Sequence, residues 1–210
     1  MNDKIIITIA REYGSGGREI GKQLAEKLNI PFYDKELITR AAEESGIDPD
    51  LFENADEKPS NPFWTSLAFN IGTFGSHSPT MNDLPMNDRL FLLQSKTIRK
   101  IAQEGSCVIV GRCGDYILEN EQNAVHLFIH ATPEDKLERV IHSYGIPAEG
   151  AQEFMKKTDR RRAAYYDYYV GEKWGKMERY DLSINSSALG IESTVNLILE
   201  FIKMKRNQLK

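Results

Sequence analysis

A glycine-rich turn near the start of the chain carries the residues best suited to chemistry. Gly14, Ser15, Gly16 and Gly17 come directly after an isoleucine-rich run and before an amphipathic stretch. Glycines let several backbone N–H groups point at one spot, and the start of a helix adds partial positive charge there. We therefore interpret the turn as a phosphate-binding loop, with Arg11 and Arg18 among its phosphate contacts. A plain strand-to-helix turn is the alternative.

Two charged residues follow other predicted strands and should lie near this loop. Arg112 comes just after residues 108–111, and Asp34 comes just after residues 30–33. In open α/β sheets, ligands gather at the carboxyl ends of the strands. Arg112 is therefore a candidate anion contact, with a salt bridge at the sheet edge as the alternative. Asp34 could hold a substrate hydroxyl, organise a metal shell or act as a base, or it could only cap the next helix.

The densest basic cluster lies in residues 156–166, which include three successive arginines. Phosphoryl transfer is catalysed mainly by positioning and charge stabilisation, so arginines on a closing lid are a physically sensible use of this cluster. Arg160 and Arg162 diverge by about 200° around a helix, whereas Asp159 and Arg162 are i,i+3 neighbours. One or two of the arginines therefore contact the ligand, or the helix bends. We expect Arg160, Arg162 and Asp159 to act in catalysis with Arg18. A solvated charged face is the alternative.

The loop departs from the standard phosphate-binding loop at two positions. In the standard loop, a lysine reaches the outer phosphates and a hydroxyl group holds magnesium. Here Gly17 falls where the lysine would sit and Arg18 where the hydroxyl residue would sit, with Glu19 directly after them. Arg18, Arg11 or a lid arginine could supply the charge of the lysine, although a planar guanidinium cannot copy the position of a compact ammonium. Glu19 is the candidate magnesium ligand, because a carboxylate can bind the ion.

Strand and helix patterns alternate along the chain, which predicts an α/β fold with a mainly parallel sheet. Strands are expected near residues 4–10, 31–33, 107–110, 124–130 and 181–184. Helices are expected near residues 17–29, 35–45, 87–104, 112–119, 133–143, 150–170 and 190–206. Residues 56–86 break the alternation with a mixture of glycine, proline, serine and aromatic residues. Such a segment is typical of a lid or binding loop, with surface decoration as the alternative.

Composition limits the class of protein. With 210 residues and 40% hydrophobic content, the chain can bury one core and carry an inserted subdomain or lid. A net charge of −4 argues against a nucleic-acid surface, and no apolar run is long enough to span a membrane. We expect a cytoplasmic protein that binds neither nucleic acid nor membrane. Cys107 and Cys113 are expected to be reduced thiols, and protein partners stay open.

Taken in order, these motifs resemble the cytidylate kinase-like family of P-loop nucleoside monophosphate kinases. The similarity runs from the loop through residues 33–38, 110–113 and 159–166 to residues 180–187. The resemblance implies a P-loop nucleotide kinase, with a five-stranded parallel sheet flanked by helices, an acceptor-binding insert and a helical lid. The single domain would then comprise a core in residues 1–55, 87–148 and 181–210, an insert in about 56–86 and a lid in about 149–180.

The resemblance also implies ligands and contacts. ATP or GTP with Mg²⁺ would serve as the phosphoryl donor on the loop. The residues expected to hold the acceptor are Asp34, Arg40, Gln94 and Arg112. Cytidylate kinases hold the acceptor nucleotide with a Gly-Arg-Asp element, which Gly111 and Arg112 match, whereas Cys113 stands in place of the aspartate.

The leading hypothesis is therefore ATP- and magnesium-dependent phosphoryl transfer to a small phosphorylated acceptor, with a nucleoside monophosphate such as CMP favoured. A second hypothesis is a nucleotide-binding sensor or regulatory protein with weak or lost catalysis, which the missing loop lysine supports. A third is a kinase that acts on a non-nucleotide metabolite, because the composition of the insert is unlike that of a bare nucleotide pocket.

Overall fold

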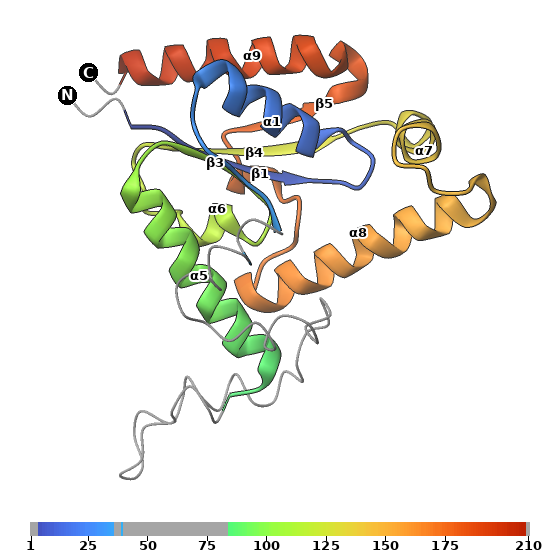
Figure 1. The fold of residues 1–210 in the computed structure, drawn as a ribbon, viewed down its shortest axis with the longest axis horizontal. Coiled ribbons are helices and arrows are strands. Elements are labelled where there is room, and N and C mark those ends of the chain that lie inside the picture. Colours follow the sequence, from blue (N-terminus) through green and yellow to red (C-terminus); the bar gives the residue numbers. More distant parts are fainter. Residues whose placement is uncertain (1–3, 36–38, 40–83, 209–210) are drawn as a thin grey trace.

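The computed structural model, which describes residues 4–35, 39 and 84–208, contains a five-stranded sheet between two layers of helices (Figure 1). The strands lie in the spatial order β2-β3-β1-β4-β5, and every neighbouring pair is parallel. Their bounds are β1 Ile6–Arg11, β2 Phe32–Tyr33, β3 Cys107–Val110, β4 Ala124–His130 and β5 Leu182–Asn185. The predicted five-stranded parallel sheet is confirmed.

The helices follow the predicted pattern with two differences at their ends. Their bounds are α1 Gly17–Leu28, α5 Met86–Glu104, α6 Gly114–Ile117, α7 Pro133–His142, α8 Ala148–Val170 and α9 Ser186–Gln208. Helix α6 is shorter than expected because Arg112 and Cys113 adopt left-handed backbone angles. Helix α9 begins earlier than expected and breaks at Gly190. Nearly all of residues 35–45 and 56–86 lie outside the described residues.

Each face of the sheet carries its own apolar core. Successive side chains of a strand point to opposite faces, so Ile7 and Ile9 of β1 pack towards α1 and α9, whereas Ile6 packs towards α5 and α6. Leu24 of α1 and Ile198 of α9 are fully buried against the first face. Figure 1 shows these two helices above the sheet and α5 and α6 below it. None of the described helices is long and apolar enough to cross a bilayer.

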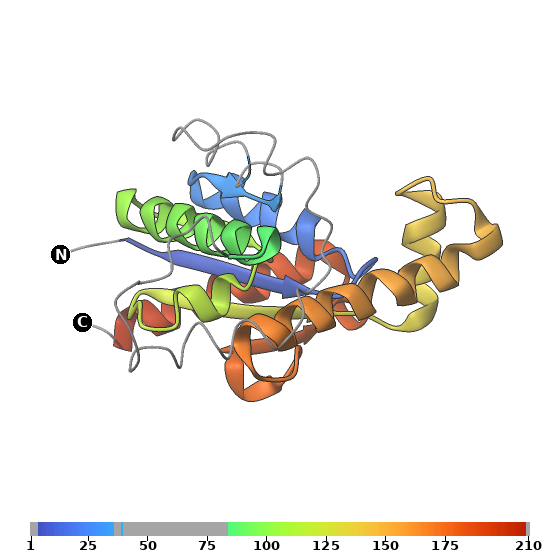
Figure 2. The same ribbon diagram turned by 90° about the horizontal axis from the view of Figure 1, so that it is seen from below.

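The carboxyl ends of all five strands lie along one edge of the sheet, because every strand pair is parallel. Helices α7 and α8 extend from this edge (Figure 2). Thr132 caps α7, since its Oγ1 accepts a hydrogen bond from the Asp135 amide at 3.3 Å and Pro133 occupies the first turn. The edge thus gathers the glycine loop, Asp34, the turn after β3 and the start of α7.

Aromatic side chains fasten the carboxyl half of α8 to the body of the protein. The ring of Tyr169 stacks on Phe91 of α5, with centroids 4.0 Å apart. Trp174, just beyond α8, meets Phe128 of β4 edge-on at 5.4 Å, and Tyr166 is buried in the core below the sheet. These aromatic residues therefore anchor this half of α8 to the body of the protein. The amino-terminal end of α8 contains a kink at Gly150, where φ is +83°.

Candidate functional site

The loop between β1 and α1 is shaped by its glycines and closed by its neighbours. Gly14 and Gly16 have left-handed angles, with φ of +81° and +78°. The Ser15 amide and hydroxyl both donate to the Glu12 carbonyl, at 3.3 and 2.9 Å. Ser186, at the start of α9, donates its hydroxyl to the Ser15 carbonyl at 2.7 Å. Left-handed residues next to a helix start turn successive N–H groups towards one point, which is the backbone geometry of an anion site.

Helix α7 packs directly against this loop. Lys136 forms an ion pair with Glu12 at 2.8 Å, and Arg139 donates from Nη1 to the Gly14 carbonyl at 2.5 Å. The expected site did not include Lys136 or Arg139. Their i,i+3 spacing on a helix that follows an edge strand is the sequence signal that could have found them.

Helix α8 reaches the loop through two of the predicted residues. The Asp159 carboxylate accepts a hydrogen bond from the Tyr13 amide at 2.6 Å. Arg162 donates from Nη1 to the Arg11 carbonyl at 3.0 Å and lies 3.6 Å from Asp159. Burial raises the pKa of Asp159, and the Tyr13 amide, Arg162 and Lys136 oppose that shift. The structure thus brings Asp159 and Arg162 together beside the loop.

Arg160 differs from its neighbours because it lies on the far side of α8. Its guanidinium pairs with Glu153 at 2.5 Å, and both side chains are 69% exposed. Arg160, which we expected to act in catalysis, thus points away from the loop, whereas Arg161 lines a pocket between α8 and the sheet edge. Tyr166 fixes the rotation of α8, and Arg162, four residues before it, shares its face. Arg160 falls about 200° away from Arg162.

Arg18 and Asp34 lie on the same edge, as expected, but bind each other. The Nη2 atom of Arg18 is 2.6 Å from Asp34 Oδ2, and its Nε donates to the same oxygen at 2.8 Å. Asp34 is buried, whereas the Arg18 side chain is half exposed. The charge of Arg18 is thereby balanced within the protein. Of the other expected contacts, Arg40 lies outside the described residues, and Gln94 is buried and lines neither pocket described below.

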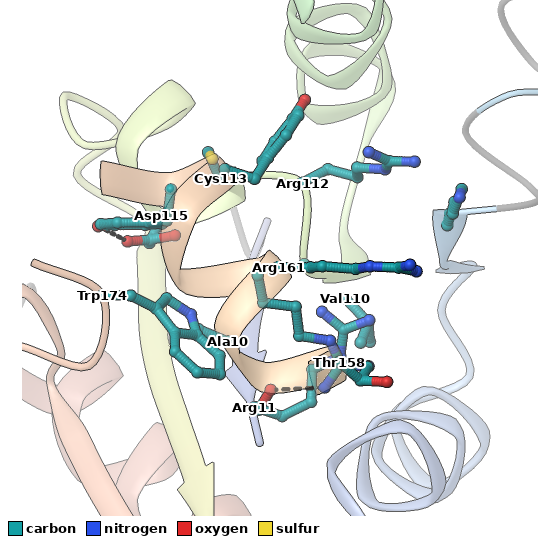
Figure 3. A pocket seen from close by; sticks show the side chains of 14 residues that line it. Ala10, Arg11, Val110, Arg112, Cys113, Asp115, Thr158, Arg161 and Trp174 are labelled. Carbon is teal, nitrogen blue, oxygen red and sulfur yellow. Dashed lines mark hydrogen bonds between the residues drawn. The ribbon is translucent and has the colours of Figure 1, made fainter. Parts of the chain in front are cut away.

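Two pockets adjoin each other beside the glycine loop. The arginine pocket, of about 260 Å³, lies between the ends of β1 and β3 and helix α8. Figure 3 shows it with Arg11, Arg112 and Arg161 around it. The loop pocket, of about 480 Å³, is lined by the glycine loop, the first turns of α1 and Tyr144. Arg11 and Arg162 line both pockets, so they stand where the two adjoin.

The charges around the arginine pocket select for an anion. Its cationic lining residues are Arg11, Lys35, Arg112, Arg161 and Arg162. Asp115 is the one carboxylate among its described lining residues, and it accepts a hydrogen bond from the Tyr166 hydroxyl at 2.5 Å. Burial raises the pKa of Asp115, with the Tyr166 hydrogen bond and Arg179 acting against that shift. The excess of positive charge favours a phosphorylated or otherwise anionic ligand.

The turn after β3 holds Arg112 in an uncommon backbone conformation. Gly111, Arg112 and Cys113 have φ values of +81°, +57° and +54° in succession. Non-glycine residues rarely adopt this region, and such strain persists where the surroundings enforce it, often at functional sites. The Arg112 guanidinium lies over the ring of Tyr165, 5.6 Å from its centroid. The turn therefore fixes the position of a cation that the sequence already placed at this edge.

The loop pocket also presents carboxylates. Among the described residues no cluster of three or more His, Cys, Asp or Glu could hold a metal. Magnesium, however, is commonly held by one or two carboxylates together with substrate phosphates and water. Glu12 and Glu19 both line the loop pocket, and Glu12 is paired with Lys136. Glu19 therefore stays the candidate ligand for a magnesium ion that would enter with a phosphorylated ligand.

The buried Asp115 should make stability depend on pH. A carboxyl group whose pKa is raised by folding stabilises the protein most at low pH, and that contribution is lost as pH rises through its folded value. We expect Asp115→Asn to become progressively more stable relative to the parent as pH rises from about 4, by about 1.4 kcal/mol for each unit of the upward shift. Urea unfolding of both proteins between about pH 4 and 8 tests this. Parallel stability curves would contradict it.

Comparison with known proteins identifies relatives along most of the chain. The sequence model of the cytidylate kinase-like family matches residues 6–188. A cytidylate kinase from Pyrococcus horikoshii is 26% identical over 200 residues, covering 93% of this chain and 87% of that protein. A uronate isomerase from Corynebacterium glutamicum is 25% identical over 153 residues, which are 72% of this chain but only 29% of that protein.

Solved structures share the fold. An uncharacterized protein from Eubacterium ventriosum is 33% identical, with a TM-score of 0.73 over 96% of this chain and 99% of that one. A shikimate kinase from Bacteroides thetaiotaomicron, 17% identical, has a TM-score of 0.53 over 95% of this chain and 99% of that one. A gluconokinase from Sinorhizobium meliloti, 13% identical, has a TM-score of 0.55 over 100% and 98% of the two chains. At these identities the last two establish the fold alone.

Proposed function

The chain belongs to the cytidylate kinase-like family, and from that premise we propose that it transfers the γ-phosphoryl group of ATP or GTP to a small phosphorylated acceptor. A nucleoside monophosphate such as CMP is the favoured acceptor. The family and the P-loop kinase fold support nucleotide-dependent phosphoryl transfer in general. The choice among acceptors rests on the arginine pocket.

The observation that carries the proposal is the junction of two pockets at Arg11 and Arg162. Phosphoryl transfer requires donor and acceptor phosphates to meet in line, with their charge neutralised. A triphosphate on the loop would direct its outer phosphate towards this junction. An acceptor in the arginine pocket would meet it there, between two arginines that line both pockets.

The lining of the arginine pocket favours a phosphate over a hydroxyl group as the attacking species. A hydroxyl must lose its proton to a nearby base. Asp115, the one described carboxylate of the pocket, already accepts a hydrogen bond from Tyr166. A phosphate monoester is largely a dianion at neutral pH, since its second pKa is about 6, and needs no base. A phosphorylated acceptor therefore fits these residues better than an alcohol.

In the proposed reaction, an oxygen of the acceptor phosphate forms a bond to the γ-phosphorus of the donor. The bond from that phosphorus to the bridging oxygen breaks, and its electron pair stays on the nucleoside diphosphate. Arg162 and Arg11 stay protonated, because a guanidinium does not titrate in this range, and they neutralise the charge on the transferring group. Magnesium held beside Glu19 would supply further charge neutralisation on the donor phosphates.

The test is a turnover assay. The protein is incubated with Mg²⁺ and either ATP or GTP against a panel of nucleoside monophosphates and unphosphorylated hydroxy acids, and diphosphate formation is followed. We expect turnover with at least one monophosphate. Turnover of hydroxy acids alone would show a metabolite kinase. Triphosphate binding without any turnover would support the nucleotide sensor, which the missing loop lysine favours.

Arg112 should determine acceptor affinity. Arg112 lines the arginine pocket and not the loop pocket, so replacing it should weaken acceptor binding while leaving donor binding intact. A hydrogen bond to a charged group contributes about 1.5–3 kcal/mol, so we expect Arg112→Ala to raise the acceptor KM by about 10- to 100-fold. Steady-state kinetics with each substrate varied in turn measures this. Arg112→Lys keeps the charge without the planar fork, so its acceptor KM should lie between those of the parent and of Arg112→Ala. An equal rise in both KM values would refute the assignment.

A further inference from the structure

Compared with the standard phosphate-binding loop, the glycine loop has a cation where the standard loop has a glycine, and a glycine where the standard loop has its lysine. The standard loop, G-x-x-x-x-G-K, begins with glycine and ends with lysine. Aligned on Gly16, this chain has Arg11 at the first position and Gly17 at the last. The chain thus has a cation at one end of the loop and none at the other, where the lysine belongs.

The structure shows why the two positions change together. A β-carbon added at Gly17 would lie 2.6 Å from Cβ of Arg11 and 3.0 Å from its Cγ. That clash involves the part of the arginine fixed to the backbone, so rotation of the side chain cannot relieve it. At the other end of the side chain, a β-carbon on Gly111 would collide with Nη1 of Arg11. Arg11 therefore extends from the last loop position to the turn after β3, through space that both glycines leave open.

Three other cations near the loop have acceptors within the protein. Arg18 binds Asp34, Lys136 binds Glu12, and Arg139 donates to a loop carbonyl. Arg11 lines both the loop pocket and the arginine pocket. Its stem lies against Gly17 and its guanidinium against Gly111, so the side chain runs along the boundary of the two pockets, where the outer phosphate of a donor would arrive.

We propose that Arg11 replaces the loop lysine as the cation on the outer phosphates of the donor. The inference rests on the proposed function in that it takes a triphosphate to be the ligand of the loop. A guanidinium presents a planar fork of donors and can bind oxygens of two phosphates, whereas an ammonium acts as a point charge. Arg11 can thus contact donor and acceptor at once while the oxygen–phosphorus bond forms and the bridging bond breaks. It contributes charge and hydrogen bonds and transfers no proton.

Exchanging the two residues tests the proposal. Arg11→Met keeps the stem of the side chain and removes the charge. Gly17→Lys adds the standard cation, but its side chain clashes with the stem of Arg11. The double variant Arg11→Gly with Gly17→Lys removes that clash and restores the standard loop. Arg99→Met, on the exposed surface of α5 and outside both pockets, is the control. Binding of inorganic tripolyphosphate is measured by calorimetry, with circular dichroism to verify folding, and turnover is measured separately.

We expect Arg11→Met and Gly17→Lys each to weaken tripolyphosphate binding at least tenfold, and the double variant to recover to within a few-fold of the parent. Unchanged binding by Arg11→Met would overturn the proposal, as would a folded double variant no better than the single ones, or a parent that does not bind tripolyphosphate. If the double variant does not fold, tripolyphosphate binding by Arg11→Met, compared with that by the control Arg99→Met, decides whether the proposal holds. The expected binding pattern without turnover of any acceptor would leave Arg11 as the phosphate cation and refute the kinase.

Discussion

Replacing Arg162 with alanine is expected to lower kcat by about a hundredfold or more, because this side chain stands where charge develops during the transfer. Arg162 lines both pockets, donates to the Arg11 carbonyl and lies over the ring of Tyr13, 5.4 Å from its centroid. Its side chain is only 19% exposed, so water screens its charge weakly. The acceptor KM should change much less than kcat. Steady-state kinetics at saturating donor measures both values.

The control for Arg162 must share its helix and charge but not its position. Lys157 meets these conditions, since it is exposed on α8 and lines neither pocket. Arg161 is unsuitable as the control because it lines the arginine pocket. Arg162→Lys should recover part of kcat if charge matters. Small and equal losses from Arg162→Ala and Lys157→Ala in an active enzyme would show that the cluster is a solvated face.

Gly14→Ala is expected to cost the protein about 2–4 kcal/mol of unfolding free energy, as the sum of a left-handed alanine and an overpacked contact. Gly14 has φ of +81°, and an added β-carbon would lie 2.7 Å from the Lys136 carbonyl oxygen. That oxygen belongs to the backbone of α7, so relief requires the helix or the loop to move. Because the same loop forms the proposed phosphate site, triphosphate binding should fall with stability. Urea unfolding and calorimetry measure the two effects.

Gly171→Ala isolates the steric part of that loss. Gly171 ends α8 with φ of +75°, and nothing lies within 4 Å of an added β-carbon. It carries the same left-handed penalty of about 1–2 kcal/mol without the clash, and it lines neither pocket. Equal destabilisation by Gly14→Ala and Gly171→Ala would mean that α7 yields easily. Unchanged triphosphate binding by Gly14→Ala would argue against the loop as the phosphate site.

The sheet could be predicted because its signals are local. A nearly continuous run of isoleucines is typical of a parallel strand that is buried on both faces. In the structure, β1 is such a strand. Capping residues placed the start of α7 at Thr132. The edge of the sheet followed from parallel topology, so Asp34 and Arg112 were expected beside the loop.

The cluster alone does not show which arginine of α8 faces the loop. Three successive arginines point in three directions around a helix, and nothing in the cluster indicates which direction faces the protein. The stripe formed by Met155, Asp159, Arg162, Tyr166 and Tyr169 has helical spacing and faces the protein. Its aromatic members are a signal that could have favoured Arg162 over Arg160. The pairing of Arg18 with Asp34 and the contacts of α7 with the loop depend on tertiary distances, which no local pattern encodes.

Helix α8 meets the loop through main-chain groups, the Tyr13 amide and the Arg11 carbonyl. Replacement of a loop side chain leaves both groups in the chain, because the peptide unit is common to every non-proline residue. These two hydrogen bonds are therefore independent of the side chains that the loop carries, whereas the packing of Phe154 and Arg162 on the ring of Tyr13 depends on that one side chain. A lineage that keeps Tyr13 could accumulate substitutions elsewhere in this loop, including the transfer of a cation from one end to the other, without evolving a new way to hold the helix in place.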